Sequence, residues 1–509
     1  MRRAELLAAI SLATDLGLGQ PMEHVLRSCA LALRLGERAG VDDSQRATTF
    51  NVALLAWIGC SADAHELARW FGDDISFRAD SYGTDLKGAG TALFMLRRIG
   101  AGSPPLGRVR AAGSFVRNGV RDFDPMRTHC EVAGSFAERL GLGEEVRSTL
   151  LQVFERWDGK GEPEGLRGDQ LALPMRLVHL SEIVEVFHRV GGVEAAIQVA
   201  RQRRGTQFDP ALVDDFCAVA SSLLADLETG STWDALSAAE PGLRRVLSGA
   251  ELDAALEAMA DFADLKSPYT LGHSRGVAEL SALAAAAYGL PDAEVETLRR
   301  AGLVHDLGRL GVSNAIWDKP GGLTPAELER VRICPYLTER MLARPEGLAR
   351  LGRIAALHHE RLDGSGYPRG LAGGAIGPAA RLLAAADVYQ ATREPRPHRN
   401  ALTRERAAAE LRAEARAGRL DGEAVNAVLD AAGHRVRSRP ELPAGLTPRE
   451  LQVLRLLARG LTSRGIGERL EISPKTARNH IEHIYSKAGV STRAGASLFA
   501  VRHGLVAES

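Results

Sequence analysis

The sequence lacks an excess of charge of one sign, a paired-cysteine framework and a long apolar run. Its 64 Lys and Arg balance 64 Asp and Glu, so a nucleic-acid surface would need a local excess of positive charge. The five cysteines are scattered without a C-x-x-C pair, which argues for a reducing compartment. No stretch reaches about 18 uncharged apolar residues, and Glu5 and Asp15 interrupt the apolar start. These absences predict a cytoplasmic protein without a membrane span.

Runs of β-branched residues are also rare. Ala, Leu, Arg and Glu are abundant instead, and apolar residues recur about every 3.6 residues, for example in the stretch 277–287. We therefore predict an all-α fold. A chain of 509 residues exceeds a single hydrophobic core, so about two to four domains are expected.

The first half of the chain contains a degenerate copy of the second half. The stretch 154–168 aligns with 359–373 without a gap, at an offset of 205 residues (359 − 154). Further upstream the offset is 249 residues (273 − 24), because His24 aligns with His273. The copies therefore differ by an insertion of 44 residues (249 − 205), which we place between about residues 59 and 127.

The second copy carries side chains that suit a metal site. Neutral imidazoles and carboxylates together bind divalent ions such as iron, manganese or zinc. Placed on helices, they could hold two ions and a water that attacks a phosphorus centre. The candidate ligands are His273, His305, Asp306, His358, His359 and Asp387.

The first copy has lost most of these side chains. Ala56-Trp57 stands in the place of the His-Asp pair, and Val153-Phe154 in the place of the His-His pair. Apolar groups cannot bind a metal ion, so we expect this copy to be metal-free. A pseudo-symmetric structural partner or a sensory pocket are its two expected roles.

The second copy, from about Asp264 to Val428, resembles the HD-GYP phosphohydrolases, a branch of the HD superfamily. The motifs that carry the resemblance are S-P-Y-T-L-G-H-S, H-D-L-G-R-L-G-V, K-P-G-G-L-T, H-H-E-R-L-D-G-S-G-Y-P and A-D-V-Y. The resemblance implies an all-α enzyme that cleaves cyclic di-GMP or a related cyclic dinucleotide. It implies that all six candidate ligands bind metal, with Asp306 bridging. Tyr269 replaces the glutamate of three-metal members, which implies two ions at most.

The resemblance also implies roles for residues around the ligands. Arg309 replaces the usual lysine and is expected to serve catalysis by offsetting negative charge on the phosphoryl oxygens. Asp306 is the other expected catalytic residue, through the metal ions that it would hold. Cys334 replaces one further histidine ligand, and its softer thiolate would favour zinc. Lys319 is a candidate phosphate contact, for which a solvated loop lysine is an equal alternative. The signature loop near the substrate comprises Gly366, Tyr367 and Pro368.

The end of the chain predicts a helix-turn-helix. Thr447 and Glu450 form a capping box for a first helix, which ends near Gly460. A short second helix leads to a polar, basic helix over 474–488, the arrangement that enters a DNA major groove. Residues 441–509 include ten Lys and Arg but only six Asp and Glu. This is the local positive excess that phosphate contacts need.

These residues resemble the LuxR-type DNA-binding domain over its full length. The motifs are L-T-P-R-E-L-Q-V-L-R-L-L-A-R-G and I-S-P-K-T-A-R-N-H-I-E-H-I-Y-S-K-A-G-V-S-T-R-A-G-A. The resemblance implies that Arg478, Asn479 and Glu482 face base edges of double-stranded DNA. It further implies a dimer contact through the final helix, 493–503, and hence a homodimer. The expected backbone contacts are Lys475, Thr476 and Lys487.

We therefore predict three domains: a degenerate HD-GYP-like domain (1–225), a metal-dependent HD-GYP domain (250–434) and a LuxR-type domain (443–509). The expected function is transcription regulation by a protein that binds a cyclic dinucleotide. Metal-dependent hydrolysis of that ligand is favoured. A non-catalytic nucleotide or metal sensor and a protein-interaction scaffold stay open as alternatives.

Overall fold

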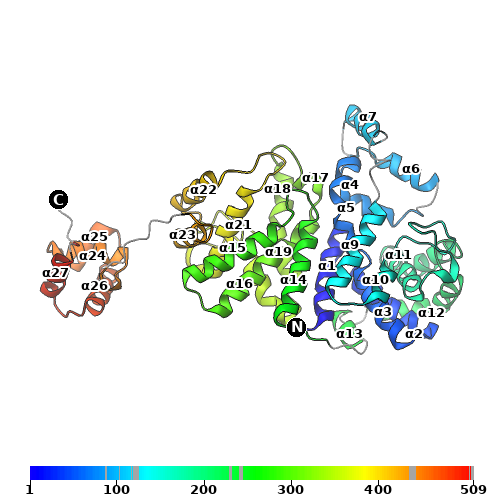
Figure 1. Ribbon diagram of the computed structural model, residues 1–509, viewed down its shortest axis with the longest axis horizontal. Coiled ribbons are helices and arrows are strands. Elements are labelled where there is room, and N and C mark those ends of the chain that lie inside the picture. The colour runs from blue at the N-terminus through cyan, green and yellow to red at the C-terminus, as the bar shows by residue number, and fades with distance from the viewer. Residues whose placement is uncertain are drawn as a thin grey trace. The chain divides into compact units, whose positions relative to one another are not determined.

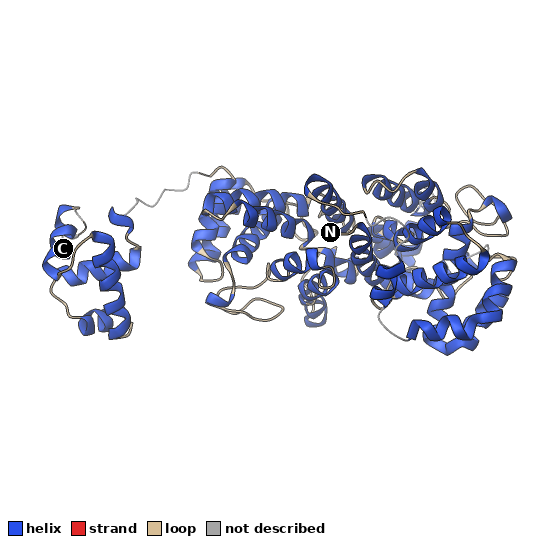
Figure 2. Cartoon of the chain, turned by 90° about the horizontal axis from the view of Figure 1, so that it is seen from below, coloured by secondary structure: helices blue, strands red, loops and turns tan. Residues whose placement is uncertain are grey.

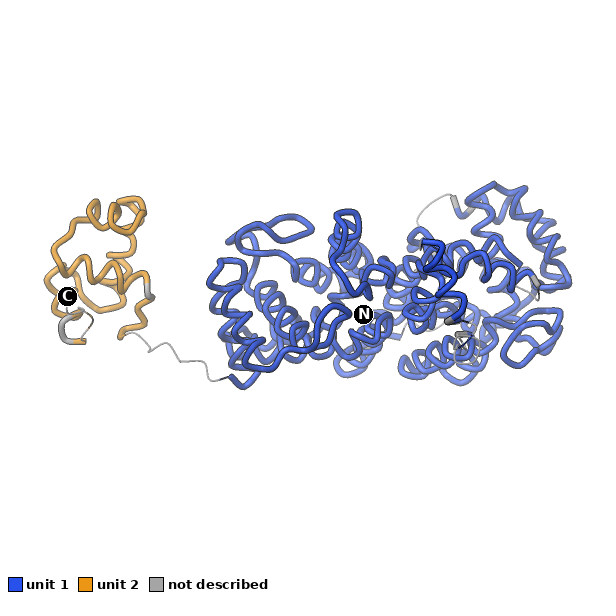
Figure 3. Tube along the Cα trace, turned by 90° about the horizontal axis from the view of Figure 1, so that it is seen from above, with its two compact units in different colours: residues 1–434 blue, residues 435–509 orange. Residues whose placement is uncertain are grey.

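The computed structural model describes residues 1–85, 89–101, 104–115, 117, 125–228, 232–239, 245–434, 443–503 and 505. Every regular element within these ranges is a helix, which confirms the all-α prediction (Figure 2). The chain forms two compact units, residues 1–434 and 435–509 (Figure 3). The first unit contains both sequence copies. Of the helices in the described ranges, none has the length and apolar character needed to cross a bilayer.

The first copy is built from long helices with an inserted group of short ones (Figure 1). Outside that group, the helices of the first copy are α1 (Arg3–Gly17), α2 (His24–Ala39), α3 (Asp43–Leu55), η1 (Ile58–Ser61), α9 (Pro125–Arg139), α10 (Glu144–Leu150), η3 (Gly168–Gln170), α11 (Leu173–Gln202), α12 (Pro210–Glu228) and α13 (Thr232–Ala239). The segment between η1 and α9, which includes the insertion, contains α4 (Ala64–Phe71), α5 (Asp74–Ser81), α6 (Ala89–Arg98) and α7 (Pro105–Ser114).

The second copy follows without the insertion. Its helices are α14 (Gly249–Asp264), α15 (His273–Tyr288), α16 (Asp292–Val304), η4 (Leu307–Gly311), α17 (Asn314–Trp317), α18 (Pro325–Arg332), α19 (Cys334–Leu342), α20 (Glu346–Ala355), η5 (Gly373–Ala375), α21 (Pro378–Arg393), α22 (Arg404–Arg416) and α23 (Gly422–Ala431). The second unit contains η6 (Pro443–Gly445), α24 (Pro448–Ala458), α25 (Ser463–Leu470), α26 (Pro474–Ala488) and α27 (Arg493–Arg502).

Helix α1 joins the two copies into one unit. It contacts α2, α3 and η1 of the first copy and η4 and α19 of the second (Figure 1). Leu6, Leu7 and Ile10 on this helix are completely buried, and one apolar core cluster continues from the first copy into the second. The apolar start of the chain is therefore the central packing helix of the first unit.

The two copies repeat the same backbone features at the predicted offset. Asp158 and Arg167 form an isolated antiparallel bridge in the first copy. Asp363 and Ala372, each 205 residues further on (363 − 158), form the same bridge in the second. The alignment of 154–168 with 359–373 is thus also a structural repeat.

The insertion lies where the change of offset predicts it. A Cβ on Gly59 would overlap His129 O, and a Cβ on Gly308 would overlap Cys334 O, so the same close approach occurs in both copies. The glycines are 249 residues apart (308 − 59), whereas their partners are 205 apart (334 − 129). The extra residues therefore fall between Gly59 and His129, in the segment that contains α4 to α7.

Candidate metal centre and nucleic-acid interface

Six of the seven predicted metal ligands meet in the second copy. They form two groups, and within each group the nearest ligand atoms lie within 4.8 Å of one another. The groups adjoin, because His273 Nε2 lies 3.2 Å from Asp387 Oδ1 and His358 Nε2 lies 3.8 Å from Asp306 Oδ1. The first group is His273, His305 and Asp306, and the second is His358, His359 and Asp387.

Two of the imidazoles are oriented by backbone carbonyls. His305 Nδ1 lies 2.7 Å from Gly302 O, and His358 Nδ1 lies 2.6 Å from Ala355 O. Because a carbonyl can only accept, each Nδ1 carries the proton and each Nε2 presents its lone pair. Both Nε2 atoms are buried and have no hydrogen-bond partner. Buried lone pairs facing carboxylates fit a bound divalent cation, so the donor set suits the predicted metal ions.

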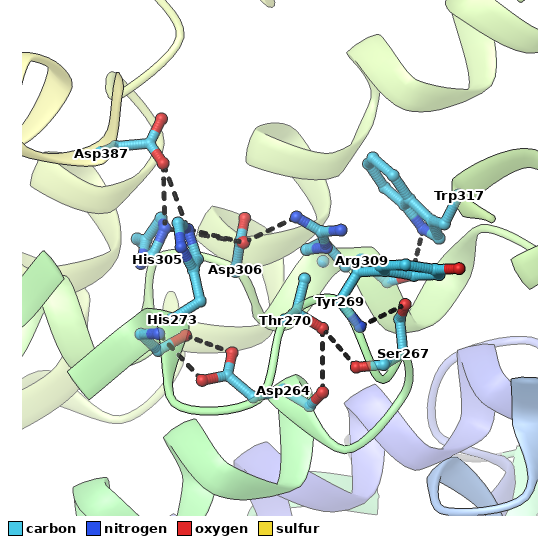
Figure 4. Close-up of polar contacts among 12 residues, drawn as sticks. Asp264, Ser267, Tyr269, Thr270, His273, His305, Asp306, Arg309, Trp317 and Asp387 are labelled. Atoms are coloured by element: carbon cyan, nitrogen blue, oxygen red, sulfur yellow. Dashed lines mark hydrogen bonds and ion pairs between the residues drawn. The ribbon is translucent and has the colours of Figure 1, made fainter. Parts of the chain in front are cut away.

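Glu394 orients the third buried imidazole. Its Oε2 lies 2.9 Å from His273 Nδ1, while His273 Nε2 faces Asp387 and Asp306 (Figure 4). A carboxylate behind a histidine fixes the ring and raises its basicity. Glu394 was missed in the sequence, although it follows Asp387 by seven residues, which is two turns of α21.

The electrostatics of the centre keep its carboxylates ionised. Burial alone would raise the pKa of Asp306, but His305, Arg309 and His273 outweigh it and hold that pKa far below its ordinary value. Burial lowers the pKa of His358 to about 4, so this imidazole is neutral at neutral pH. Asp306 and His358 are thus in the protonation states that metal binding requires. Burial lowers the pKa of His273, but Asp387 and Glu394 outweigh it and raise that pKa to about 10, so a metal ion bound there would displace a proton.

Arg309 lies at the edge of the first group. Its Nη1 donates to Asp306 Oδ2 at 3.1 Å, and its guanidinium carbon lies 4.1 Å from the ring centroid of Trp317 (Figure 4). The indole of Trp317 also donates to Arg309 O at 3.2 Å. Stacking and pairing together hold a planar cation next to the candidate ligands, as the prediction for Arg309 requires.

Cys334, the seventh predicted ligand, lies outside both groups. It is buried in an apolar cluster with Val312, Ile316 and Val331. Burial raises the pKa of its thiol to about 12, so the thiol stays protonated at neutral pH. A protonated thiol is a poor metal ligand.

The predicted substrate loop is fixed by a buried carboxylate. Glu360 accepts hydrogen bonds from Arg369 N and Leu371 N, each at 2.8 Å, and Glu155 holds the matching loop of the first copy in the same way. The loop brings the ring of Tyr367 to 4.7 Å from that of His359, between centroids. It therefore lies beside the second ligand group.

Gly366 allows this loop to approach the chain closely. A Cβ at this position would lie 2.5 Å from Glu360 Cα and from His359 O. We expect Gly366→Ala to reduce the free energy of unfolding of the first unit by about 1–3 kcal/mol, since backbone atoms must move. Calorimetry of the full chain measures this as a lower melting temperature of that unit. Gly374→Ala is the matched control, because a Cβ at this position would have no atom within 4 Å. Equal melting temperatures of the two variants would contradict the prediction.

Lys319, the candidate phosphate contact, is paired with a carboxylate in the structure. Its Nζ lies 2.7 Å from Glu327 Oε2 in an exposed loop. Glu327 also accepts from Thr324 N at the start of α18. A phosphate would have to compete with this ion pair.

In the first copy, aromatic rings occupy the corresponding place. Trp57 and Phe154 align with Asp306 and His359, and their ring centroids lie 5.7 Å apart. His129 lies 5.7 Å from Trp57 and 5.0 Å from Phe154, and burial lowers its pKa to about 4. The first copy therefore packs aromatic rings and a neutral imidazole at the position where the second copy places its metal ligands.

The second unit presents all six of its predicted DNA-contacting residues on one helix, α26. On α26, Ala477, Ile481 and Ile484 are buried against the unit, at helical spacing. The positions between them project outward. The exposed predicted residues are Lys475, Thr476, Arg478, Asn479, Glu482 and Lys487.

Two of these six make contacts within the unit. Lys487 Nζ pairs with Glu450 Oε2 at 2.8 Å, so its charge is partly used to hold α26 against α24. The hydroxyl of Thr476 lies 2.8 Å from that of Ser473, which caps the helix. For Lys475, Arg478, Asn479 and Glu482, no side-chain hydrogen bond or ion pair to another described residue is present, and these four remain available to a ligand.

The fold and the clustered ligands define an all-α, HD-type metal-dependent phosphohydrolase. A family model of the HD domain matches residues 257–424, and a model of bacterial regulatory proteins of the luxR family matches residues 444–500.

Known cyclic dinucleotide phosphodiesterases match this chain over different lengths. The 3'3'-cGAMP-specific phosphodiesterase 3 of Vibrio cholerae is 32% identical over 414 residues, which is 80% of this chain and 89% of that protein. The cyclic di-GMP phosphodiesterase response regulator RpfG of Xanthomonas campestris is 37% identical over 156 residues, 30% of this chain and 41% of that protein. A crystal structure of a cyclic GMP-AMP specific phosphodiesterase from V. cholerae superposes with a TM-score of 0.59 at 28% identity. It covers 85% of this chain and 98% of the known one.

The chain belongs to the HD-GYP family of metal-dependent phosphohydrolases, with a degenerate N-terminal copy and a C-terminal domain of the LuxR type. This confirms both resemblances seen in the sequence.

Proposed function

We propose that this protein is a DNA-binding regulator whose second copy holds two divalent metal ions and hydrolyses a cyclic dinucleotide. One observation carries the proposal. The Nε2 atoms of His305 and His358 are buried, have no partner, and face the carboxylates of Asp306 and Asp387. Such an arrangement is unfavourable without a cation and favourable with one.

The two ligand groups would each hold one ion, with Asp306 between them. The donor set of imidazoles and carboxylates suits iron, manganese or zinc. When bound, the ions would supply an activated water and neutralise charge on the phosphodiester. The other tasks belong to the chain. Arg309 donates to the phosphoryl oxygens from beside Asp306, and the loop of Gly366, Tyr367 and Pro368 bounds the substrate next to His359.

The proposed substrate is 3'3'-cGAMP. The V. cholerae enzyme whose name specifies this dinucleotide matches over both copies of the chain, whereas RpfG, named for cyclic di-GMP, matches over 156 residues. The longer match to the V. cholerae enzyme favours 3'3'-cGAMP as the substrate.

The proposed role of the second unit is to bind double-stranded DNA. Arg478, Asn479 and Glu482 are exposed on the outward face of α26 and would contact base edges, while Lys475 and Thr476 would contact the backbone. Leu498 on α27 is 52% exposed and would contribute to a contact between two copies. A dimer would place two such helices on two half-sites of the operator.

Incubation of the metal-loaded full chain with 3'3'-cGAMP and with cyclic di-GMP tests the proposal. Linear dinucleotide products are separated and quantified by chromatography. We expect hydrolysis of both, with the higher kcat/KM for 3'3'-cGAMP. Tight binding of either nucleotide without any product would exclude the enzyme and leave a sensor, and binding of neither would exclude both.

The ligand set is tested separately at Cys334. We expect Cys334→Ala to keep the metal content of the wild-type protein, because this buried, protonated thiol lies outside both ligand groups. Elemental analysis by mass spectrometry gives ions per chain. His358→Ala is the positive control and is expected to lose metal. Loss of one ion from the Cys334→Ala protein would make Cys334 a ligand after all.

A further inference from the structure

Helices α4 and α5 of the first copy contact two loops of the second copy beside the metal centre. These loops are residues 265–272, which lead into His273, and residues 312–318, which include the short helix α17 and Trp317. From α4, the Nδ1 atom of His65 lies 2.8 Å from Asp318 Oδ2. The ring of His65 also makes an edge contact with Tyr269, with the centroids 6.3 Å apart. Helix α4 thus contacts both loops through one side chain.

Asp318 ties the two loops to each other. Its carboxylate accepts from Ser267 Oγ at 2.6 Å and from Asn314 Nδ2 at 2.9 Å, in addition to His65. Ser267 belongs to the loop that leads into His273. The hydrogen bond that His65 donates to Asp318 raises the pKa of His65, which favours a charged imidazole at this contact.

The chain of contacts from His65 through Asp318 continues to Arg309, the arginine proposed to act in catalysis. Trp317, next to Asp318, donates to Arg309 O and stacks on the Arg309 guanidinium (Figure 4). Arg309 in turn pairs with Asp306. A shift of Asp318 would therefore move Trp317, and with it the cation proposed to contact the phosphodiester.

Helix α5 of the first copy makes a second contact with the same two loops. Asp74, on α5, is completely buried and accepts from Ser313 Oγ at 2.7 Å and from Asn314 N at 2.8 Å. It also pairs with Lys266 Nζ at 3.1 Å. Because Asp74 and Lys266 are buried charges, this contact is structural, and its removal would leave a charge unpaired. His65 is only partly buried, so the loops stay attached without it.

We propose that His65, supplied by the degenerate first copy, is a positioning residue of the phosphodiester site in the second copy. It holds Asp318, and through it Trp317 and Arg309, in the geometry that binds substrate. The first copy would then set the substrate affinity of the second, which gives its helix α4 a role in the reaction. This inference rests on the proposed hydrolase.

Three variants of the metal-loaded full chain test it by steady-state kinetics with the cyclic dinucleotide. His65→Ala is expected to raise KM about five- to tenfold and leave kcat within about twofold, because one charge-assisted hydrogen bond is lost. His65→Asn, whose amide can donate from the position of Nδ1, is expected to recover most of the affinity. Ser76→Ala, at an exposed position on α5, is the matched control and is expected to match the wild type.

A double-mutant cycle checks the route through Asp318. Addition of His65→Ala to Asp318→Asn should raise KM no further, because the shared contact is already lost. An unchanged KM in His65→Ala, no recovery in His65→Asn, or additive effects in the cycle would each overturn the inference. So would a fall in melting temperature of more than about 5 °C in His65→Ala, since His65 would then be a structural residue. A wild-type protein that hydrolyses no cyclic dinucleotide would instead refute the proposed function.

Discussion

Asp306→Asn is expected to lower the turnover of the cyclic dinucleotide by at least about 10³-fold. Asp306 lies between the two ligand groups, with its carboxylate oxygens 3.7 Å from His273 Nε2 and 3.8 Å from His358 Nε2. Asparagine keeps the shape and removes the negative charge that both ions would share. Loss of metal-assisted charge stabilisation amounts to several kcal/mol, and each 1.36 kcal/mol is tenfold in rate. The rate of linear product formation at saturating substrate and metal measures the effect.

The control for this prediction is Asp292→Asn. Asp292 is exposed at the start of α16, the helix that ends next to His305, and its replacement removes the same charge far from the ligands. We expect wild-type turnover in the control. Circular dichroism confirms that both variants keep their helical content. A turnover in Asp306→Asn within tenfold of the wild type would show that Asp306 holds no catalytic ion.

Arg478→Ala is expected to lower the affinity for the specific operator by about 10- to 100-fold, because a bidentate contact from arginine to guanine contributes about 1–3 kcal/mol. Arg478 is exposed on the outward face of α26 and makes no side-chain contact with another described residue. The operator is first selected from a pool of random DNA duplexes with the wild-type protein. Fluorescence anisotropy then gives the affinity of the variant for the operator and for unrelated DNA, at one fixed salt concentration.

Arg459→Ala is the matched control for charge. Arg459 is also exposed, but it is the C-cap residue of α24 and does not belong to α26. Its loss is expected to change the affinity by less than about threefold and equally for all sequences. If Arg478→Ala also weakened operator and unrelated DNA equally, Arg478 would contact phosphate and not a base.

The ligand positions were predictable because motifs set them locally. His358 and His359 are adjacent, and His305 precedes Asp306, so each pair needs only a short backbone segment to present both side chains. The capping box of Thr447 and Glu450 was predictable for the same reason, and it forms with Thr447 Oγ1 accepting from Glu450 N at 3.2 Å. Local chemistry and spacing are sufficient for such features.

Contacts between distant segments were not predictable. His65 and Asp318 are 253 residues apart, and nothing in either motif indicates that helix α4 contacts the second copy. Cys334 aligns with a histidine ligand of the family, but its role depends on Val312, Ile316 and Val331 around it, which keep the thiol protonated. Alignment shows which residue occupies a position, whereas the packing around that position decides what it can bind.

Metal content of the purified full chain tests the central claim most directly. The protein is expressed in medium supplemented with iron, manganese and zinc, purified without chelator, and analysed by elemental mass spectrometry against the Asp306→Asn variant. The two ligand groups predict about two ions per wild-type chain and fewer in the variant. Less than about 0.2 ions per wild-type chain, unchanged after reconstitution with each metal, would contradict the account.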